Sequence, residues 1–250
     1  DERDERLARL DWSKDERLEV VKAIYKTGVR IPSICFSGHR RYPLGSNDPV
    51  LEEKSLELMK KCIELAQDLG VRTIQLAGYD VYYEEKSPQT RQRFIKNLRK
   101  ACDWAEEAQV VLAIEIMDDP FINSIEKYLA VEKEIDSPYL FVYPDIGNVS
   151  AWHNDVYSEF YLGHHAIAAL HLKDTYAVTE SSKGQFRDVT FGQGCVKWEE
   201  AFDILKQTNY NGPFLIEMWS ENCETVEETR AAIQEAQAFL YPLIKKAGLM

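Results

Sequence analysis

The order of apolar and amphipathic segments predicts an α/β fold, and within that class a (β/α)₈ barrel. Short apolar runs alternate along the chain with longer amphipathic stretches, which is the pattern of a parallel sheet with helical crossovers. Polar residues recur at the C-terminal ends of these runs, where barrel enzymes place their catalytic groups. No Gly-x-Gly-x-x-Gly sequence follows a run, so a dinucleotide-binding open sheet lacks its fingerprint.

Six runs rich in Val, Ile, Leu or aromatic residues are the expected strands. They cover Val29–Ser37, Val71–Tyr79, Val110–Met117, Leu140–Ile146, Ile167–Lys173 and Gly212–Trp219. A closed barrel of this type has eight strands, and the residues before Val29 supply a helix but no convincing strand. The chain also begins without Met. We therefore expect N-terminal units of the barrel, two strands by this count, to be missing from this chain, with an open six-stranded sheet as the alternative.

Start and stop signals mark the helices between these strands. Ser13 can cap a helix that continues through Thr27, with Gly28 just past its end. Pro49 suits the first turn of the next helix, which Gly70 closes. Further helices are expected from Ser87–Pro88 onward, at Asn123–Ile135, near Asp155–Leu162, at Val196–Thr208 and at Glu224–Ala247. Together these elements predict one barrel domain over residues 1–250.

Composition narrows the class of protein. With 250 residues, 45% of them hydrophobic, the chain can bury one large core. A net charge of −12 argues against a nucleic-acid partner, and no apolar run approaches the roughly 18 residues needed to span a bilayer. Five scattered cysteines form no Cys-x-x-Cys pair, which fits a reducing cytosol. We therefore expect a cytoplasmic protein with neither a nucleic-acid nor a membrane partner.

Four charged or imidazole residues lie near the ends of apolar runs, where such side chains are unusual. They are Glu115, Asp145, His171 and Glu217. Carboxylates are seldom buried unless they are paired or bound to a metal. Three carboxylates and one imidazole suit Mn²⁺, Mg²⁺, Co²⁺ or Zn²⁺, and the absence of Cys argues against a structural zinc site. The residues alone leave a divalent-metal site and a buried ion-pair network both open.

Polar residues in the neighbouring loops are candidates for substrate contacts. The loop after the first expected strand carries His39, Arg40 and Arg41, and potentially cationic side chains in an otherwise acidic chain suit a phosphate. The other candidates, each in a segment that follows a proposed ligand or strand, are Asn148, Lys173 and Arg187. Ordinary solvated loop polarity is the alternative for all of them.

Segments at the strand ends also resemble those of one enzyme family. They read Cys-Phe-Ser-Gly-His-Arg-Arg-Tyr-Pro-Leu-Gly-Ser, Gln-Leu-Ala-Gly-Tyr-Asp-Val-Tyr-Tyr, Ala-Ile-Glu-Ile-Met-Asp, Tyr-Pro-Asp-Ile-Gly-Asn, His-Leu-Lys-Asp-Thr and Leu-Ile-Glu-Met-Trp-Ser-Glu. They are similar to segments of the L-ribulose-5-phosphate 3-epimerases, also called L-xylulose-5-phosphate 3-epimerases, of bacterial L-ascorbate breakdown. These enzymes belong to the xylose isomerase-like TIM barrel superfamily, and the resemblance covers essentially the whole chain.

The resemblance places the first two strands and the first helix of the barrel ahead of Asp1, in agreement with the strand count, and it implies a role for each strand-end residue. It implies that all four bind one divalent metal ion and that Glu115 and Glu217 also act as the catalytic acid/base pair. The implied reaction is 3-epimerisation of a ketopentose 5-phosphate, from L-xylulose 5-phosphate to L-ribulose 5-phosphate, through a metal-stabilised enediolate. A homo-oligomer, a dimer, is expected from the resemblance alone, since the residues do not indicate an oligomeric state.

Other functions remain open from the residues. An aldose–ketose isomerase of the same barrel type would move hydrogen between C1 and C2. A sugar-phosphate-binding protein without catalysis is the alternative from a different class. An endonuclease IV-like repair enzyme would need more histidines for its zinc ions and a basic groove, and five histidines with a charge of −12 argue against it.

Overall fold

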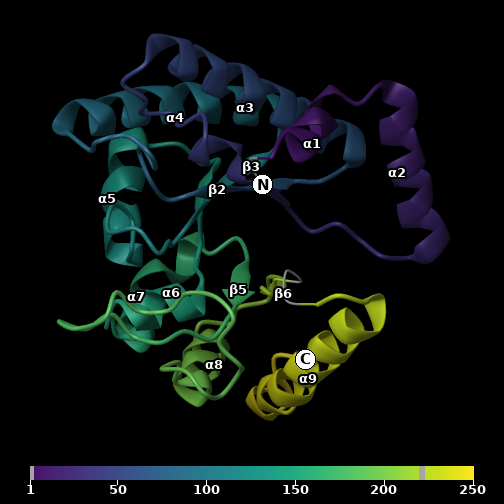
Figure 1. The fold of residues 1–250 in the computed structure, drawn as a ribbon, viewed down its shortest axis with the longest axis vertical. Coiled ribbons are helices and arrows are strands. Elements are labelled where there is room, and N and C mark those ends of the chain that lie inside the picture. Colours follow the sequence, from purple (N-terminus) through teal and green to yellow (C-terminus); the bar gives the residue numbers. More distant parts are fainter. Residues whose placement is uncertain (1–2, 220–222) are drawn as a thin grey trace. The chain divides into compact units, whose positions relative to one another are not determined.

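The computed structural model of the chain describes residues 3–219 and 223–250 (Figure 1). The chain divides into two compact units, of which the first comprises Asp1–Glu115 and Tyr128–Phe141, and the second Ile116–Lys127 and Val142–Met250. Each of the six strands in the described residues lies within one of the six runs that the sequence predicts. The prediction of a single domain stays a prediction, as does that of missing N-terminal elements.

The first unit contains a parallel sheet whose strands follow the order of the sequence. β1 (Ile34–Phe36) pairs with β2 (Thr73–Ala77), and β2 pairs with β3 (Val111–Glu115). β4 (Leu140–Tyr143) comes next in the order of this sheet, and the chain passes from the first unit into the second within it. The register sets Ala77 opposite Glu115 at the C-terminal end of β3.

Helices cover the strands of the first unit. They are α1 (Asp4–Leu7), α2 (Lys14–Thr27), α3 (Pro49–Leu69), α4 (Pro88–Ala108) and α5 (Ile125–Ile135), with two 3₁₀ turns, η1 (Ala8–Asp11) and η2 (Ser37–Arg40). The long helices α3 and α4 lie side by side (Figure 1). Their inner faces enclose Met59, Cys62 and Leu98 completely, so this unit has a continuous apolar core.

The predicted helix signals are confirmed at atomic detail. The Ser13 side chain accepts a hydrogen bond from the Glu16 N–H, and the Glu16 side chain accepts one from the Ser13 N–H. These two bonds form a capping box at the start of α2. Pro49 is the first residue of α3. Gly28 and Gly70 end α2 and α3 with φ angles of 70° and 71°, the left-handed conformation that glycine adopts at little cost.

All six predicted strands are longer than the strands observed in the described residues, and for two of them a proline explains the difference. β1 begins only at Ile34, after Pro32, which has no N–H to donate to a ladder. The run predicted as Leu140–Ile146 ends as a strand at Tyr143, because Pro144 has no N–H to donate and Asp145 caps a helix. This helix, α6 (Ile146–Ala151), is absent from the sequence-based prediction.

The second unit contains the strands and helices of the C-terminal half. β5 (Leu170–Leu172) pairs in parallel with β6 (Phe214–Ile216), and isolated parallel bridges join the end of β4 and the residues after it to the β5 region. The helices are α6, α7 (Val156–Gly163), α8 (Trp198–Gln207) and α9 (Val226–Ala247), with the 3₁₀ turn η3 (His164–Ala166). Phe160, Phe202 and Leu240 form part of its buried core.

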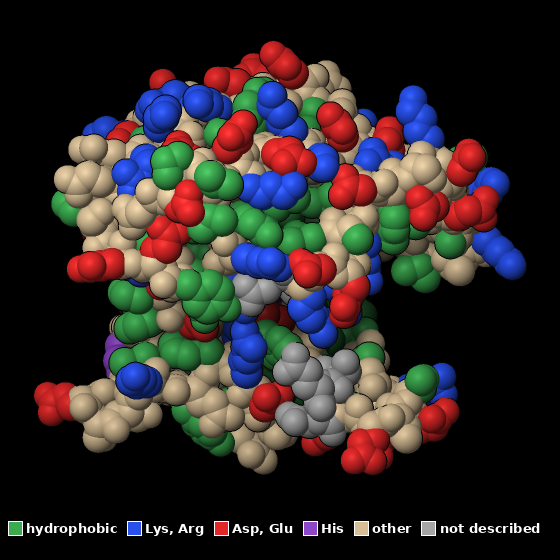
Figure 2. All heavy atoms as spheres, turned by 45° about the horizontal axis from the view of Figure 1, so that its top comes forward, with side chains coloured by type: hydrophobic (Ala, Val, Ile, Leu, Met, Phe, Trp, Pro, Cys, Tyr) green, Lys and Arg blue, Asp and Glu red, His purple; other side chains and the backbone are tan. Residues whose placement is uncertain are grey.

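The visible surface carries charged side chains of both signs, interspersed rather than separated (Figure 2). No helix in the described ranges combines the length and the apolar character that crossing a bilayer requires.

Candidate metal centre

Three of the predicted ligands lie together in the second unit because they occupy the ends of neighbouring strands. A parallel bridge pairs Asp145 with His171, and the β5–β6 register pairs His171 with Leu215, two residues before Glu217. The Glu217 N–H donates to the Leu172 carbonyl at 3.0 Å, which extends the ladder to the ligand position. The parallel pairing therefore brings all three side chains to one edge of the strands.

The three side chains are close enough to share one ion. His171 Nδ1 lies 3.3 Å from Glu217 Oε2 and 3.9 Å from Asp145 Oδ2. Asp145 is fully buried, and its Oδ1 accepts the Asn148 N–H at 2.9 Å. The Lys173 ammonium lies between the two carboxylates, with Nζ 3.0 Å from Asp145 Oδ2 and 3.1 Å from Glu217 Oε2. A cation therefore already compensates part of the buried negative charge.

The two carboxylates differ in their affinity for a proton. Burial raises the pKa of Asp145 well above its usual value, although Lys173 opposes this effect. Burial also acts to raise the pKa of Glu217, but Lys173 and His171 outweigh it and hold that pKa well below its usual range. Glu217 is therefore ionised at neutral pH, the state in which a carboxylate can accept a proton or bind a metal.

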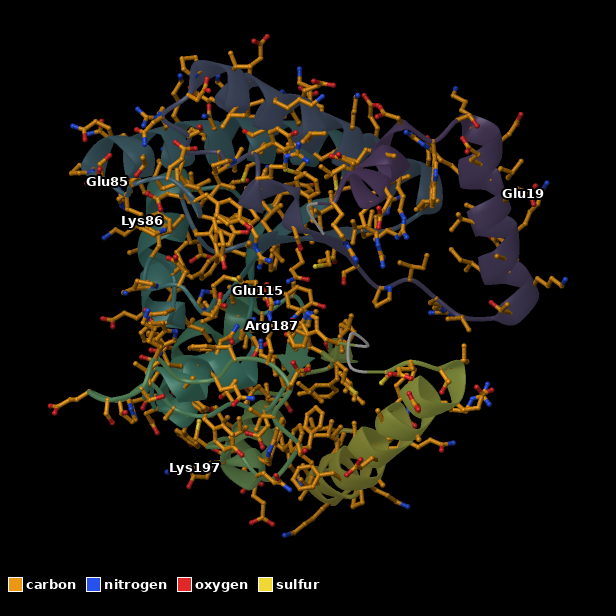
Figure 3. The ribbon with its side chains drawn as sticks, viewed as in Figure 1. Glu19, Glu85, Lys86, Glu115, Arg187 and Lys197 are labelled. Atoms are coloured by element: carbon orange, nitrogen blue, oxygen red, sulfur yellow. The ribbon has the colours of Figure 1, made fainter. Side chains whose placement is uncertain are left out.

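Glu115 is the last residue of β3 and ends the first of the two segments that form the first unit. Its Oε2 accepts a hydrogen bond of 2.6 Å from Gln75 Nε2 on β2, and Figure 3 labels it at the end of its strand. One potential ligand atom from each of Asp145, His171 and Glu217 lies within 4.8 Å of the others in the second unit. The structure thus brings together three of the four predicted ligands, and the role of Glu115 stays a prediction.

The donor set fits a divalent cation. Asp145 Oδ2 and Glu217 Oε2 are buried, and neither receives a hydrogen bond of good geometry from the described residues, although both lie near Lys173. Buried carboxylate oxygens normally have such partners, and oxygen and imidazole nitrogen atoms are the ligands that Mn²⁺, Mg²⁺, Co²⁺ and Zn²⁺ accept. These atoms are therefore suited to hold a divalent ion.

Asn148 has a structural contact that the sequence does not predict. Its Nδ2 donates to the Ile116 carbonyl at 2.8 Å, which links the start of α6 to the residue after Glu115. Its Oδ1 is buried and accepts no hydrogen bond from the part of the chain that the structure describes. Asn148 thus fixes the turn after Asp145 and keeps one acceptor available for a ligand.

The basic loop in the first unit holds two cations at neutral pH instead of the predicted three. His39 is buried beneath the edge of Phe36, with ring centroids 4.7 Å apart, and burial lowers its pKa to about 3. Arg40 stacks over Tyr82 at 4.8 Å, and Arg41 pairs with Asp4 at 2.6 Å. Any positive charge that this loop offers to a phosphate comes from the two arginines.

Arg187 and Lys173 both lie close to one indole ring in the second unit. Arg187 lies in the long connection between β5 and α8 (Figure 3), with its guanidinium carbon 5.0 Å from the centroid of Trp219. Lys173 Nζ lies 5.4 Å from the same centroid. A pocket of about 560 Å³ adjoins this group and is lined by Lys173, Glu217 and Trp219, among others.

Two contacts at the site escape prediction from the sequence. Gln75 interrupts the apolar run Thr-Ile-Gln-Leu-Ala, which is the same signal that identifies Glu115, and a search for polar residues in strands would have found it. Trp219 is different, because an aromatic residue at the end of an apolar run gives no sign of the cations beside it.

The fold and the strand-end ligands together define a class of protein. The model of the xylose isomerase-like TIM barrel family matches residues 1–243, and the chain belongs to this family. The protein called "Putative L-ribulose-5-phosphate 3-epimerase SgbU" of Escherichia coli (strain K12) is 52% identical over 250 residues, which are 100% of this chain and 86% of that protein. L-ribulose-5-phosphate 3-epimerase UlaE of Escherichia coli O157:H7 (strain EC4115 / EHEC) is 50% identical over 250 residues, 100% of this chain and 85% of that protein.

Solved structures share the fold at low identity. The structure of an L-ribulose 3-epimerase superposes with a TM-score of 0.74 at 18% identity, over 92% of this chain and 80% of that one. A D-psicose 3-epimerase crystallised in the presence of D-fructose gives a TM-score of 0.74 at 15% identity, over 93% of this chain and 86% of that one. The predicted barrel class and the predicted resemblance to the L-ribulose-5-phosphate 3-epimerases are confirmed.

Proposed function

We propose that the chain is a metal-dependent 3-epimerase that interconverts L-xylulose 5-phosphate and L-ribulose 5-phosphate. The observation that carries the proposal is the strand-end ligand set in a chain that is 50% identical, over its full length, to an L-ribulose-5-phosphate 3-epimerase. The ligand set supplies the chemistry of the reaction, and the relatives supply the identity of the sugar.

Inversion at C3 of a 2-ketose needs two proton transfers on opposite faces. One carboxylate removes the proton from C3, and the electron pair of the C–H bond moves toward the neighbouring C2 carbonyl to give an enediolate. The second group, protonated as a carboxylic acid, then donates its proton to C3 from the other face and becomes a carboxylate. We assign these two roles to Glu115 and Glu217, and ionised Glu217 has the protonation state that a base requires.

The remaining ligands hold the cation and the charge balance. The divalent ion, when bound, polarises the ketose carbonyl and stabilises the negative charge that develops on its oxygen. Asp145 and His171 complete the set that would hold it. Lys173 stays beside Asp145 and Glu217 and offsets the charge of the carboxylates.

The other proposed substrate contacts come from the loops around the strand ends. They are His39, Arg40, Arg41, Asn148, Lys173 and Arg187. We assign the phosphate to the arginines, because a guanidinium pairs with phosphate in a planar, bidentate way. The resemblance further supports a cytoplasmic location, a homodimeric state and a role in L-ascorbate breakdown. Light scattering of the purified protein measures the oligomeric state.

Turnover in D₂O tests the proposed function. With Mn²⁺ present, we expect L-xylulose 5-phosphate to be converted into L-ribulose 5-phosphate with deuterium incorporated at C3, and EDTA to stop the conversion. Deuterium at C1 or C2 together with an aldose product would indicate an aldose–ketose isomerase instead. Binding of the sugar phosphate without exchange would indicate a non-catalytic binding protein.

A further inference from the structure

A buried carboxylate next to the metal site binds the backbone of a distant loop. Asp174 directly follows Lys173 and is 1% exposed. Its two oxygens accept four backbone N–H groups, those of Thr175 at 2.9 Å, Gly192 at 2.8 Å, Gly194 at 3.1 Å and Val196 at 3.3 Å. Burying an ionised carboxylate is costly unless such donors surround it. Asp174 therefore fixes residues 192–196, which end the segment 186–196 that we call the anchored loop.

The two glycines of the anchored loop fit this role. A Cβ on Gly194 would lie 2.0 Å from Asp174 Oδ1 and 2.4 Å from the Thr175 carbonyl oxygen, so only glycine allows the backbone to approach the carboxylate this closely. Gly192 has a φ of 85°, a left-handed conformation that glycine adopts readily. The two glycines of the sequence Gly-Gln-Gly thus allow the backbone N–H groups to reach the Asp174 carboxylate.

The start of the anchored loop carries the cation nearest to Trp219. Arg187 is exposed, its guanidinium carbon is 5.0 Å from the Trp219 centroid, and within the described ranges no carboxylate pairs with it. Trp219 follows Glu217 by two residues, and Lys173 lies over the same ring. The pocket that adjoins Glu217 is lined by the four residues of the anchored loop that follow Arg187, 188–191. The loop therefore forms one wall of the space beside the proposed base.

We propose that Asp174 is a positioning residue, which fixes the anchored loop so that Arg187 stays on Trp219 and pairs with the phosphate of the substrate. The inference rests on the proposed function and adds to it the residue that sets affinity for the phosphorylated sugar. The carboxylate is specific for this task, because an amide of the same size offers one acceptor and presents an NH₂ group to backbone donors.

Asp174→Asn is the test variant and Asp203→Asn is its matched control. Asp203 is an exposed residue of α8 outside the anchored loop. For Asp174→Asn we expect the KM for the ketopentose 5-phosphate to rise about tenfold or more, while kcat and the affinity for Mn²⁺ change by less than about threefold. The KM for the unphosphorylated ketose should stay unchanged. Equal losses with both sugars would overturn the inference.

A double-mutant cycle with Arg187→Ala identifies the route of the effect. If Asp174 acts through Arg187, the KM of the double variant equals that of the single variant with the higher KM. If the fold-increases in KM of the two single variants multiply in the double variant, the two residues act independently and the inference is overturned. Arg187→Ala alone should raise the KM selectively for the phosphorylated sugar, and an unchanged KM overturns the inference even if Asp174→Asn does not fold.

Limited proteolysis tests the anchored loop without any substrate. Trypsin can cleave after Lys183 and Arg187, and we expect cleavage there to be faster in folded Asp174→Asn than in wild type or Asp203→Asn, because the loop loses its anchor. An unchanged cleavage rate would overturn the role of Asp174. This readout distinguishes a failure of the inference from a failure of the proposed function, since it needs no turnover.

Discussion

Glu217 combines two tasks that both require an ionised carboxylate. As a metal ligand it must bind a cation, and as a base it must accept a proton from C3. Burial disfavours ionisation, but Lys173 Nζ at 3.1 Å and His171 Nδ1 at 3.3 Å reverse the balance. The same residue is therefore prepared for both roles by its cationic neighbours.

Replacing Glu217 by Gln should abolish exchange at C3. Gln keeps the shape of the side chain but cannot accept the proton, so we expect solvent deuterium exchange at C3 of the bound ketose to fall by about 100-fold or more. The rate is measured by NMR with saturating Mn²⁺, and metal content is determined alongside so that loss of the ion is recognised. Glu53→Gln, an exposed change on α3, is the control. Exchange at the wild-type rate would exclude Glu217 as the acid or base.

The residues of the site differ in how far the sequence predicts them. Glu115 and His171 interrupt apolar runs, and the cost of burying such groups is a local signal. The position of Lys173 between two carboxylates depends on the direction of its side chain at the end of β5, and the cations beside Trp219 come from a separate loop. These contacts exist only in the folded chain, so neither spacing nor composition could have predicted them.

At the scale of elements, the turn η2 buries a histidine where the sequence suggested a cation. His39 lies against Phe36, and burial takes its pKa from 6.5 to about 3. Between these two pH values the unfolded chain binds a proton that the folded chain does not. The packing of η2 is therefore linked to pH, and protonation of His39 favours unfolding.

The free energy of unfolding should decrease as the pH falls below about 6.5, with His39 contributing about 1.4 kcal/mol per pH unit. Urea denaturation at several pH values between neutral and mildly acidic measures this slope. His39→Gln should flatten it, because the variant has no group to protonate, whereas the exposed-site variant His165→Gln should retain it. An equal slope in wild type and His39→Gln would contradict the burial of a neutral imidazole.

Helices were easier to predict than strand ends. The Ser13 cap and the left-handed Gly28 and Gly70 are local signals, so α2 and α3 follow from the sequence. α6 was missed because Ile146 continues the apolar run of β4, and hydrophobicity alone cannot separate a strand from the helix that follows. The Pro144–Asp145 pair was the relevant signal, since it ends the ladder and caps α6.

At the scale of the whole molecule, the alternation of strands and helices predicted the α/β class. The polar strand ends favoured a barrel, and the resemblance of the strand-end segments indicated the family whose model matches residues 1–243. The alternation did not predict the two compact units of the chain. Such a division depends on which side chains contact each other, which periodicity does not encode. The division into units does not affect the prediction for three of the strand-end ligands, because these three come from neighbouring strands of the second unit.

Metal binding should contribute to the stability of the folded chain as a whole. Asp145, His171 and Glu217 come from segments far apart in the sequence, so the unfolded chain cannot present them together. A cation that binds only the folded state at 100 times its Kd stabilises it by about 2.7 kcal/mol. We therefore expect Tm to rise with increasing Mn²⁺ and EDTA to reverse the rise, as measured by calorimetry.

Asp145→Asn should lose this dependence of Tm on Mn²⁺, while the exposed change Asp103→Asn retains it. A metal-dependent rise of the same size in Asp145→Asn would place the bound ion elsewhere, because a buried ligand at the centre of the set cannot be removed without weakening the site.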